Sequence, residues 1–196
     1  MRQAVAAILA LTAGCVGALK SDYPERRFYT LSAHRPGEAA APAKEGVLRV
    51  RRFTASKLSE GNELVTRTSE SEYETDFYNA FFSPPATQVT EQTHRWLGAS
   101  GLFSAVVGTG SSVPETHVLE GNVVALHADE RQSTAVMELQ FMLVRVSSDP
   151  TAVLFQKSYR EATAGVSDPE ARVRGWTTAL GRILSALERD LAALQK

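Results

Sequence analysis

The sequence predicts an α+β fold, with a mixed or antiparallel sheet of about 5–7 strands and two main helices packed on one face. The first observation is a series of three long segments, 117–127, 135–146 and 153–162, which are rich in strand-forming residues and separated by polar loops. The second is a helical spacing of apolar residues at about 84–98 and about 169–195. The order strands, helix, strands, long helix is typical of a sheet that helices cover on one side.

The segment 169–195 carries the clearest helical pattern in the chain. Asp168 is a candidate N-cap and Pro169 suits the first turn. Apolar residues follow at intervals of three and four: Val173, Trp176, Leu180, Ile183, Leu184, Leu187, Leu191 and Leu194. Such a helix is about 40 Å long at its normal rise per residue. We expect it to pack across the sheet rather than to pair with a partner helix as a coiled coil.

The shorter helix, at about 84–98, follows a pair of prolines. Ser83 is the predicted N-cap, and Pro84 and Pro85 are tolerated in a first turn. Gly98 or Gly101 can end the helix. Shorter strands are predicted before and after it, at Phe28–Ser32, Val47–Phe53, Leu64–Thr68, Glu72–Phe77 and Leu102–Val107, of which the third and fourth form a hairpin.

The first residues have the three parts of a secretory signal. Arg2 is a minimal positive region, Ala4–Ala13 is apolar, and small residues precede Cys15. The apolar run is too short to span a bilayer, which needs about 20 residues. LTAGC, residues 11–15, resembles the bacterial lipobox, although Thr12 stands where a large residue is usual. We therefore expect a lipoprotein signal peptide over 1–14, with lipid attached to Cys15. The alternative is an ordinary signal peptide with an incidental cysteine.

Composition gives no indication of an enzyme, a metal site or a nucleic-acid interface. The formal net charge is −1, and the one cysteine excludes an intramolecular disulfide. The four histidines, His34, His94, His117 and His127, lack the spacing of metal ligands. There is no GxSxG motif, and Gly108-Thr109-Gly110 lacks the third glycine and the lysine of a phosphate loop. No catalytic residue, metal or cofactor is predicted.

The stretch SESEYETDFYNAFFSPPA, residues 69–86, combines acids with aromatic residues. In an extended strand Glu72, Glu74 and Asp76 point to one side and Tyr73, Thr75 and Phe77 to the other. Neighbouring carboxyls on one face lie about 6.6–7 Å apart, a spacing that an inverting glycosidase also uses. Acid and base need different surroundings, however, and these three acids look alike. We expect a solvated acidic face and an apolar face packed inward.

Those acids have a candidate structural partner in the basic strand before them. Residues 20–57 carry nine Lys or Arg and four Asp or Glu, whereas residues 58–91 carry one Arg and seven Asp or Glu. Arg49 and Arg51 share one face of their strand. We expect cross-strand pairs between these arginines and the acids, each stabilising the sheet by about 0.2–1 kcal/mol.

The middle of the chain resembles the ABC-type transport auxiliary lipoprotein family, the group that contains paraquat-inducible protein C. Residues 64–107, LVTRTSESEYETDFYNAFFSPPATQVTEQTHRWLGASGLFSAVV, carry the resemblance. The same order continues with HVLEGNVVALHAD, AVMELQFMLVRV, VLFQKSYR and the terminal ALGRILSALERDL, and RFYTL near the start also fits. Coverage runs from about Phe28 to Leu191. Some members have a tryptophan shortly before the proline pair, where this chain has Phe81-Phe82.

The resemblance implies a non-enzymatic accessory subunit of an MCE-type system, which moves lipid between the two membranes of Gram-negative bacteria. The expected organisation is a signal peptide at 1–14, a lipidated tether at 15–27 and one α+β domain at 28–196. The expected partners are an MCE-domain protein and the membrane, through acylated Cys15. Some relatives form rings, so a homo-oligomer is also compatible. Val16, rather than aspartate, follows the cysteine, which favours the outer over the inner membrane.

Three functions are weighed against one another. The first is this docking subunit of a lipid transporter. The second is a module that binds one lipid by itself, in a pocket lined by Phe77, Phe81 and Phe82. The third is a hydrolase that uses Glu72, Glu74 or Asp76. The candidate contacts with partner or lipid are Tyr73, Phe77, Phe81 and Phe82.

Overall fold

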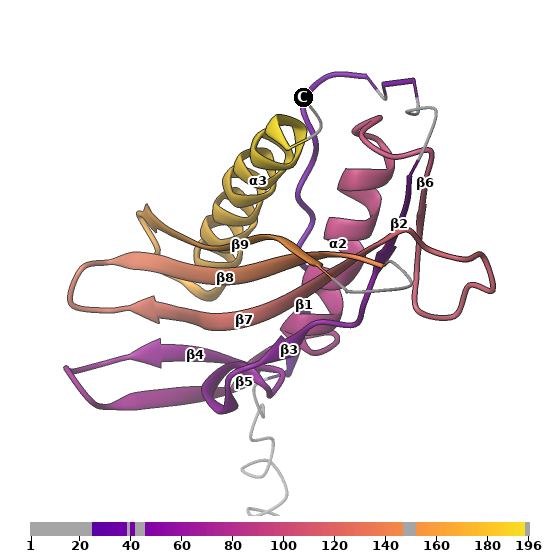
Figure 1. Cartoon of the computed structure of the whole chain (residues 1–196). Coiled ribbons are helices and arrows are strands. Elements are labelled where there is room, and N and C mark those ends of the chain that lie inside the picture. Colours follow the sequence, from indigo (N-terminus) through magenta and orange to yellow (C-terminus); the bar gives the residue numbers. More distant parts are fainter. Residues whose placement is uncertain (1–24, 39, 42–45, 147–151, 195–196) are drawn as a thin grey trace, which may run out of the picture.

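A computed structural model describes residues 25–38, 40–41, 46–146 and 152–194. The predicted signal peptide, Cys15 and most of the predicted tether lie outside these ranges. Three long antiparallel strands form one side of the sheet (Figure 1): β7 (His117–Asp129), β8 (Thr134–Arg145) and β9 (Ala152–Ala164), with β9 at its edge. They match the three predicted long strands, because alternating side chains and polar turns specify hairpins locally.

Three short strands pair in succession with the edge of β7 that faces away from β8, and each is parallel to β7. These are β2 (Val47–Val50), β3 (Thr54–Ala55) and β4 (Glu63–Arg67), with a 3-10 turn at Lys57–Ser59 between the last two. Beyond them lie β5 (Tyr73–Phe81), antiparallel to β4, then β1 (Arg27–Tyr29), parallel to β5, and β6 (Ala105–Val107), parallel to β2.

The sheet therefore has nine strands, and the predicted number of about 5–7 is wrong. Strands β1 and β6 overlap the segments predicted at Phe28–Ser32 and Leu102–Val107, and have three residues each. Strand β3 was not predicted, because its two residues are too few to show the alternation that identifies a strand. The predicted hairpin at Leu64–Thr68 and Glu72–Phe77 is confirmed as β4 and β5.

Both helices pack on one face of this sheet, as predicted (Figure 1). α2 spans Pro85–Gly98 and α3 spans Pro169–Ala193. Asp168 caps α3 by accepting a hydrogen bond from the backbone N–H of Ala171 at 2.8 Å. The predicted cap of α2, Ser83, is wrong by one residue, since Pro84 occupies the N-cap position.

The core lies between this face and the two helices. Every second residue of β8 faces α3 and is buried: Ala135, Met137, Leu139, Phe141 and Leu143. Close approach depends on two glycines. A Cβ at Gly175 would lie 2.7 Å from the Cβ of Ala135, and a Cβ at Gly121 would lie 2.7 Å from the ring of Phe53. Glycine therefore lets α3 contact β8 and lets Phe53 lie over β7.

The expected pairing of Arg49 and Arg51 with the acids of residues 72–76 is wrong. Strand β2 lies between β6 and β7, not beside β5. Arg49 pairs with Glu115 at 2.8 Å, and Arg51 pairs with Glu120 at 2.5 Å. The regional charge imbalance was real, but parallel pairing to β7 brought a different set of acids to the arginines.

Candidate functional site

Strand β5 contains an irregularity that decides how its aromatic residues are displayed. Glu63 of β4 pairs with Ala80, but the next residue, Leu64, pairs with Asp76. Residues 77–79 are thus left without a partner on β4, and the strand bulges there. The Asp76 carboxylate holds the bulge by accepting hydrogen bonds from the backbone N–H groups of Tyr78 and Asn79, each at 3.0 Å, and from the Asn79 side-chain amide at 2.9 Å.

The prediction that Phe77 packs inward is wrong, since Phe77 is 69% exposed. Alternation along β5 places Phe77 with Tyr73, and Tyr73 packs against His127 on the sheet face that the helices do not cover. The carboxylate of Asp76, one of the three acids considered for catalysis, instead accepts hydrogen bonds from backbone and side-chain N–H groups. Glu72 and Glu74 are exposed, as expected for a solvated face.

Exposed rings gather on this side of the molecule. Phe28 and Phe82 are 55% and 72% exposed, and their ring centroids lie 6.3 Å apart. The Phe77 ring packs edge-on against Tyr78 at 5.2 Å. The guanidinium of Arg26 lies 5.5 Å from the Phe28 ring and 5.5 Å from the Phe77 ring, and so joins the two pairs. We call Phe28, Phe77, Tyr78 and Phe82 the aromatic patch.

The other two candidate contact residues have different surroundings. Phe81 is only 1% exposed and packs against Trp176 in the core, with ring centroids 5.6 Å apart. Tyr73 is 37% exposed and packs edge-on against His127 at 5.5 Å. Phe81 therefore does not share an exposed surface with Phe77 and Phe82, and a pocket lined by all three, which would support the lipid-binding alternative, is not seen among the described residues.

His127 is a buried side chain with no polar partner in the described part of the chain. It is 4% exposed, and neither ring nitrogen makes a hydrogen bond there. Its neighbours Leu126 and Ala128 belong to the core, so the imidazole points to the sheet face opposite the helices. Burial, assisted by the positive charge of Arg160, lowers the pKa of His127 below its ordinary value of 6.5.

This lowered pKa predicts a loss of stability in mild acid. As the pH falls through about 6.5, the unfolded chain binds a proton that the folded chain still refuses, so the free energy of unfolding decreases. The decrease from this group is at most about 1.4 kcal/mol per pH unit. We expect His127→Leu to flatten the curve, measured by urea unfolding at about pH 7.5 and about pH 5.

Burial also lowers the pKa of His117. Because His117 is present in both wild type and His127→Leu, some dependence of stability on pH remains in the variant. A His117→Gln variant measures that part separately. Parallel curves for wild type and His127→Leu would contradict the prediction.

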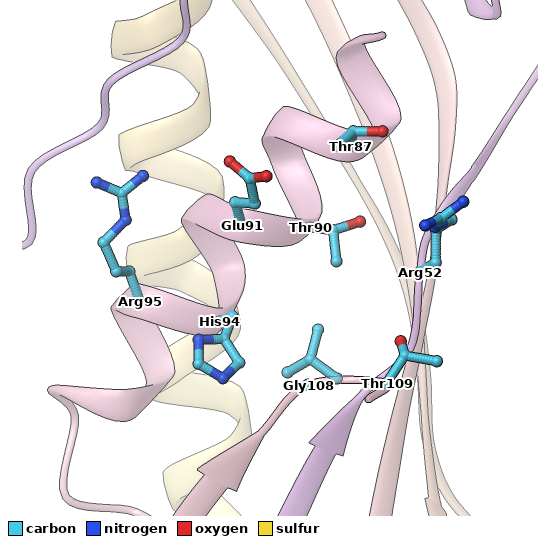
Figure 2. Close-up of a pocket in the computed structure, with 9 residues that line it drawn as sticks. Arg52, Thr87, Thr90, Glu91, His94, Arg95, Gly108 and Thr109 are labelled. Atoms are coloured by element: carbon cyan, nitrogen blue, oxygen red, sulfur yellow. The ribbon is translucent and has the colours of Figure 1, made fainter. Parts of the chain in front are cut away.

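A cavity of about 560 Å³ lies between α2 and the strands β2 and β6. Its lining includes Thr87, Thr90 and His94 from α2, with Arg52, Gly108 and Thr109 opposite. Figure 2 shows Thr90 projecting toward Arg52, whereas Glu91 and Arg95 extend from the outer side of the helix. The charged residues of the lining are two arginines, Arg52 and Arg95, and one carboxylate, Glu91.

The polar side chains of this cavity form no catalytic or metal-binding arrangement within the described residues. The Thr90 hydroxyl already accepts from the backbone N–H of Phe53 at 3.0 Å and donates to the carbonyl of Ala86 at 2.7 Å. His94 makes no hydrogen bond to a serine or threonine hydroxyl within the described ranges, so no nucleophile and base are paired there. Across those same ranges, no three His, Cys, Asp or Glu side chains gather as a metal ion would require.

The sheet and its two helices form a small α+β domain, and several solved structures have a similar fold. A crystal structure of a Xanthomonas campestris protein of the DUF330 family has a TM-score of 0.70 at 20% identity, covering 82% of this chain and 92% of that one. An uncharacterized protein has a TM-score of 0.67 at 15% identity, with 85% and 99% covered. A hypothetical protein from Chlamydia trachomatis reaches 0.50 at 11% identity, with 76% and 94% covered. At these identities the likeness shows the fold.

The sequence itself matches a family model over residues 29–191, that of the ABC-type transport auxiliary lipoprotein component. The chain belongs to this family, as the resemblance predicted. Curated proteins give no significant match. Among the described residues, no helix is both long and apolar enough to cross a bilayer.

Sequence reasoning missed part of the site. It did not single out Tyr78, which follows Phe77 in β5, or Arg26 and Phe28, which parallel pairing of β1 with β5 brings to Phe77 and Phe82. It also missed the cavity, because the lining residues Arg52 and His94 are separated by 42 positions in the sequence. The aromatic content of residues 77–82 was the signal available for the patch, and no local signal marked the cavity.

Proposed function

We propose that this protein is a lipid-anchored periplasmic accessory subunit of an ABC/MCE-type intermembrane lipid transport system. The family match over residues 29–191 carries the proposal. It is supported by the lipobox-like LTAGC at residues 11–15, which lies outside that match and is therefore a separate observation. The subunit has no catalytic role of its own in this proposal, since the ATPase, permease and MCE protein are separate chains.

The proposed organisation is a signal peptide at 1–14, a tether at 15–27 that begins with acylated Cys15, and the domain at 28–196. Several acyl chains bind a bilayer firmly, because each buried methylene contributes about 0.8 kcal/mol. Val16 after the cysteine favours the outer membrane. The domain then docks on the MCE assembly from that side, as one copy or as a homo-oligomer.

Crosslinking in intact envelopes tests both the membrane anchor and the docking on an MCE-domain protein. We expect tagged wild-type protein to fractionate with membranes and to recover an MCE-domain protein after crosslinking. Cys15→Ser is the matched control, and should remain unacylated and lose the membrane fraction. Recovery of membrane-bound protein without any MCE-domain chain would overturn the docking proposal and leave the anchor intact.

The second candidate, a module that binds one lipid by itself, is favoured by the cavity of about 560 Å³ beside Arg52 and His94. Arg52 in its wall can pair with a phosphate headgroup. Native mass spectra of the same purified protein distinguish the two functions: a lipid adduct that Arg52→Ala removes would favour the binding module.

A further inference from the structure

The aromatic patch is a contiguous group of exposed rings on the described part of the chain. Single exposed apolar residues are normal in soluble proteins, but a contiguous group marks an interaction site. Phe28, Phe77 and Phe82 are each more than half exposed, at 55%, 69% and 72%. They touch one another directly or through Arg26.

The backbone holds these rings in place rather than leaving them on a free loop. Phe28 lies in β1, whose register with β5 places it opposite Ala80. The backbone N–H of Phe82 donates to the carbonyl of Tyr29 at 2.8 Å. Phe77 is set by the bulge that Asp76 caps. The patch is therefore a rigid, preformed surface, and little ordering is needed when something covers it.

The position of the patch along the chain indicates what covers it. Arg26 follows Cys15 by 11 residues (26 − 15). Even a fully extended chain of that length spans at most about 40 Å. With acyl groups on Cys15, the patch lies where the domain follows this short tether, so the rings can reach the bilayer without straining the connection.

The charges around the patch fit a lipid surface that need not be anionic. Arg26 pairs with Glu63 at 3.5 Å, and Arg27 lies close to Glu25 and Tyr78 around one shallow hollow. The basic groups are thus matched by acids. Aromatic rings are favoured at the boundary between headgroups and acyl chains, where ring faces meet apolar chains and nearby polar groups stay hydrated.

We propose that the aromatic patch, with Arg26, lies in the headgroup region of the bilayer that holds the acylated Cys15, and so sets the orientation of the domain on that membrane. This inference rests on the proposed acylation of Cys15. The contact is made by ring burial, so it needs no anionic lipid and persists at high salt, unlike an electrostatic contact between exposed charges.

Tryptophan reporters in the full acylated protein test the contact. Phe77→Trp and Phe82→Trp each keep a ring at an exposed position, and the native Trp96 and Trp176 are buried, at 3% and 0%. The protein is reconstituted in phosphatidylcholine vesicles that carry bromine on the acyl chains close to the headgroups. We expect the added tryptophan to be quenched by about twofold or more, with no change at high salt.

Val153→Trp is the matched control. Val153 is 58% exposed but lies in β9, at the opposite edge of the sheet from β1. Its fluorescence should not be quenched by the same vesicles. The comparison cancels any effect of the vesicles on the native tryptophans, which all three variants share.

The outcomes separate this inference from the proposal on which it rests. Protein that does not float with the vesicles overturns the anchor and the patch together. Protein that floats, with reporters at 77 and 82 no more quenched than the reporter at 153, overturns the patch alone. Reporters that become shielded only when an MCE-domain protein is added would assign the patch to protein docking and overturn the membrane contact.

Discussion

Replacing Trp176 with alanine is expected to lower the free energy of unfolding by about 3–5 kcal/mol. Trp176 is 0% exposed and lies where α3 meets the sheet. Its ring packs against Phe81, and its indole Nε1–H donates to the carbonyl of His127 at 3.3 Å. Truncation leaves a large apolar void in a core that closes only partly around it, because α3 is held against β8 along its length.

Circular dichroism during urea unfolding measures this change, since the mutation also removes a fluorescent probe. Trp176→Phe is the control: it keeps an aromatic ring and loses the indole hydrogen bond, so we expect a smaller loss, about 1–2 kcal/mol. A loss below about 1 kcal/mol for the alanine variant would show that α3 repacks over the site, contrary to the expectation.

The second large effect is expected at Glu188, which joins three segments of the fold. Its carboxylate accepts from the Arg35 guanidinium at 2.8 and 3.0 Å and from the Trp96 indole N–H at 2.7 Å. These partners lie in the segment after β1 and in α2, while Glu188 lies in α3. Glu188→Ala is expected to cost about 2–3 kcal/mol, because it leaves a buried indole donor and a partly buried guanidinium without their acceptor.

A graded series checks the origin of this effect. Glu188→Gln keeps a carbonyl acceptor for Trp96 but loses the charge that pairs with Arg35, so its loss of stability should lie between those of wild type and the alanine variant. Hydrogen exchange should show faster exchange near Arg35 in both variants, since that segment is joined to α3 through this carboxylate. Equal stability of the alanine variant and wild type would rule out a structural role for Glu188.

The parts of the fold that were predictable are those with local patterns. The boundaries of α3 follow from Asp168, Pro169 and the apolar stripe, and the strands at 117–145 follow from their alternation and polar turn. The family resemblance was also available from the order of motifs, and the family match at 29–191 agrees with it.

The pairing of distant strands was not predictable in the same way. Parallel strands need long connections, and nothing in residues 47–67 shows that β2, β3 and β4 pair in turn with one edge of β7. That pairing decided which acids Arg49 and Arg51 meet. Likewise, alternation groups Phe77 with Tyr73 on one face of β5, but only the packing of the helices decided that this face is the uncovered one.

By itself, then, the sequence determined the class of fold, the two helices, the hairpins and the family, because propensity, periodicity and motif order are written in neighbouring residues. Only the tertiary structure decided which aromatic residues belong to the core and which to the surface. Phe81 and Phe82 are adjacent in the chain, yet one is 1% exposed and the other 72%. The physical reason is that burial depends on what packs against a residue, and here that is set by β1, the Asp76-capped bulge and α3, which come from separate parts of the chain.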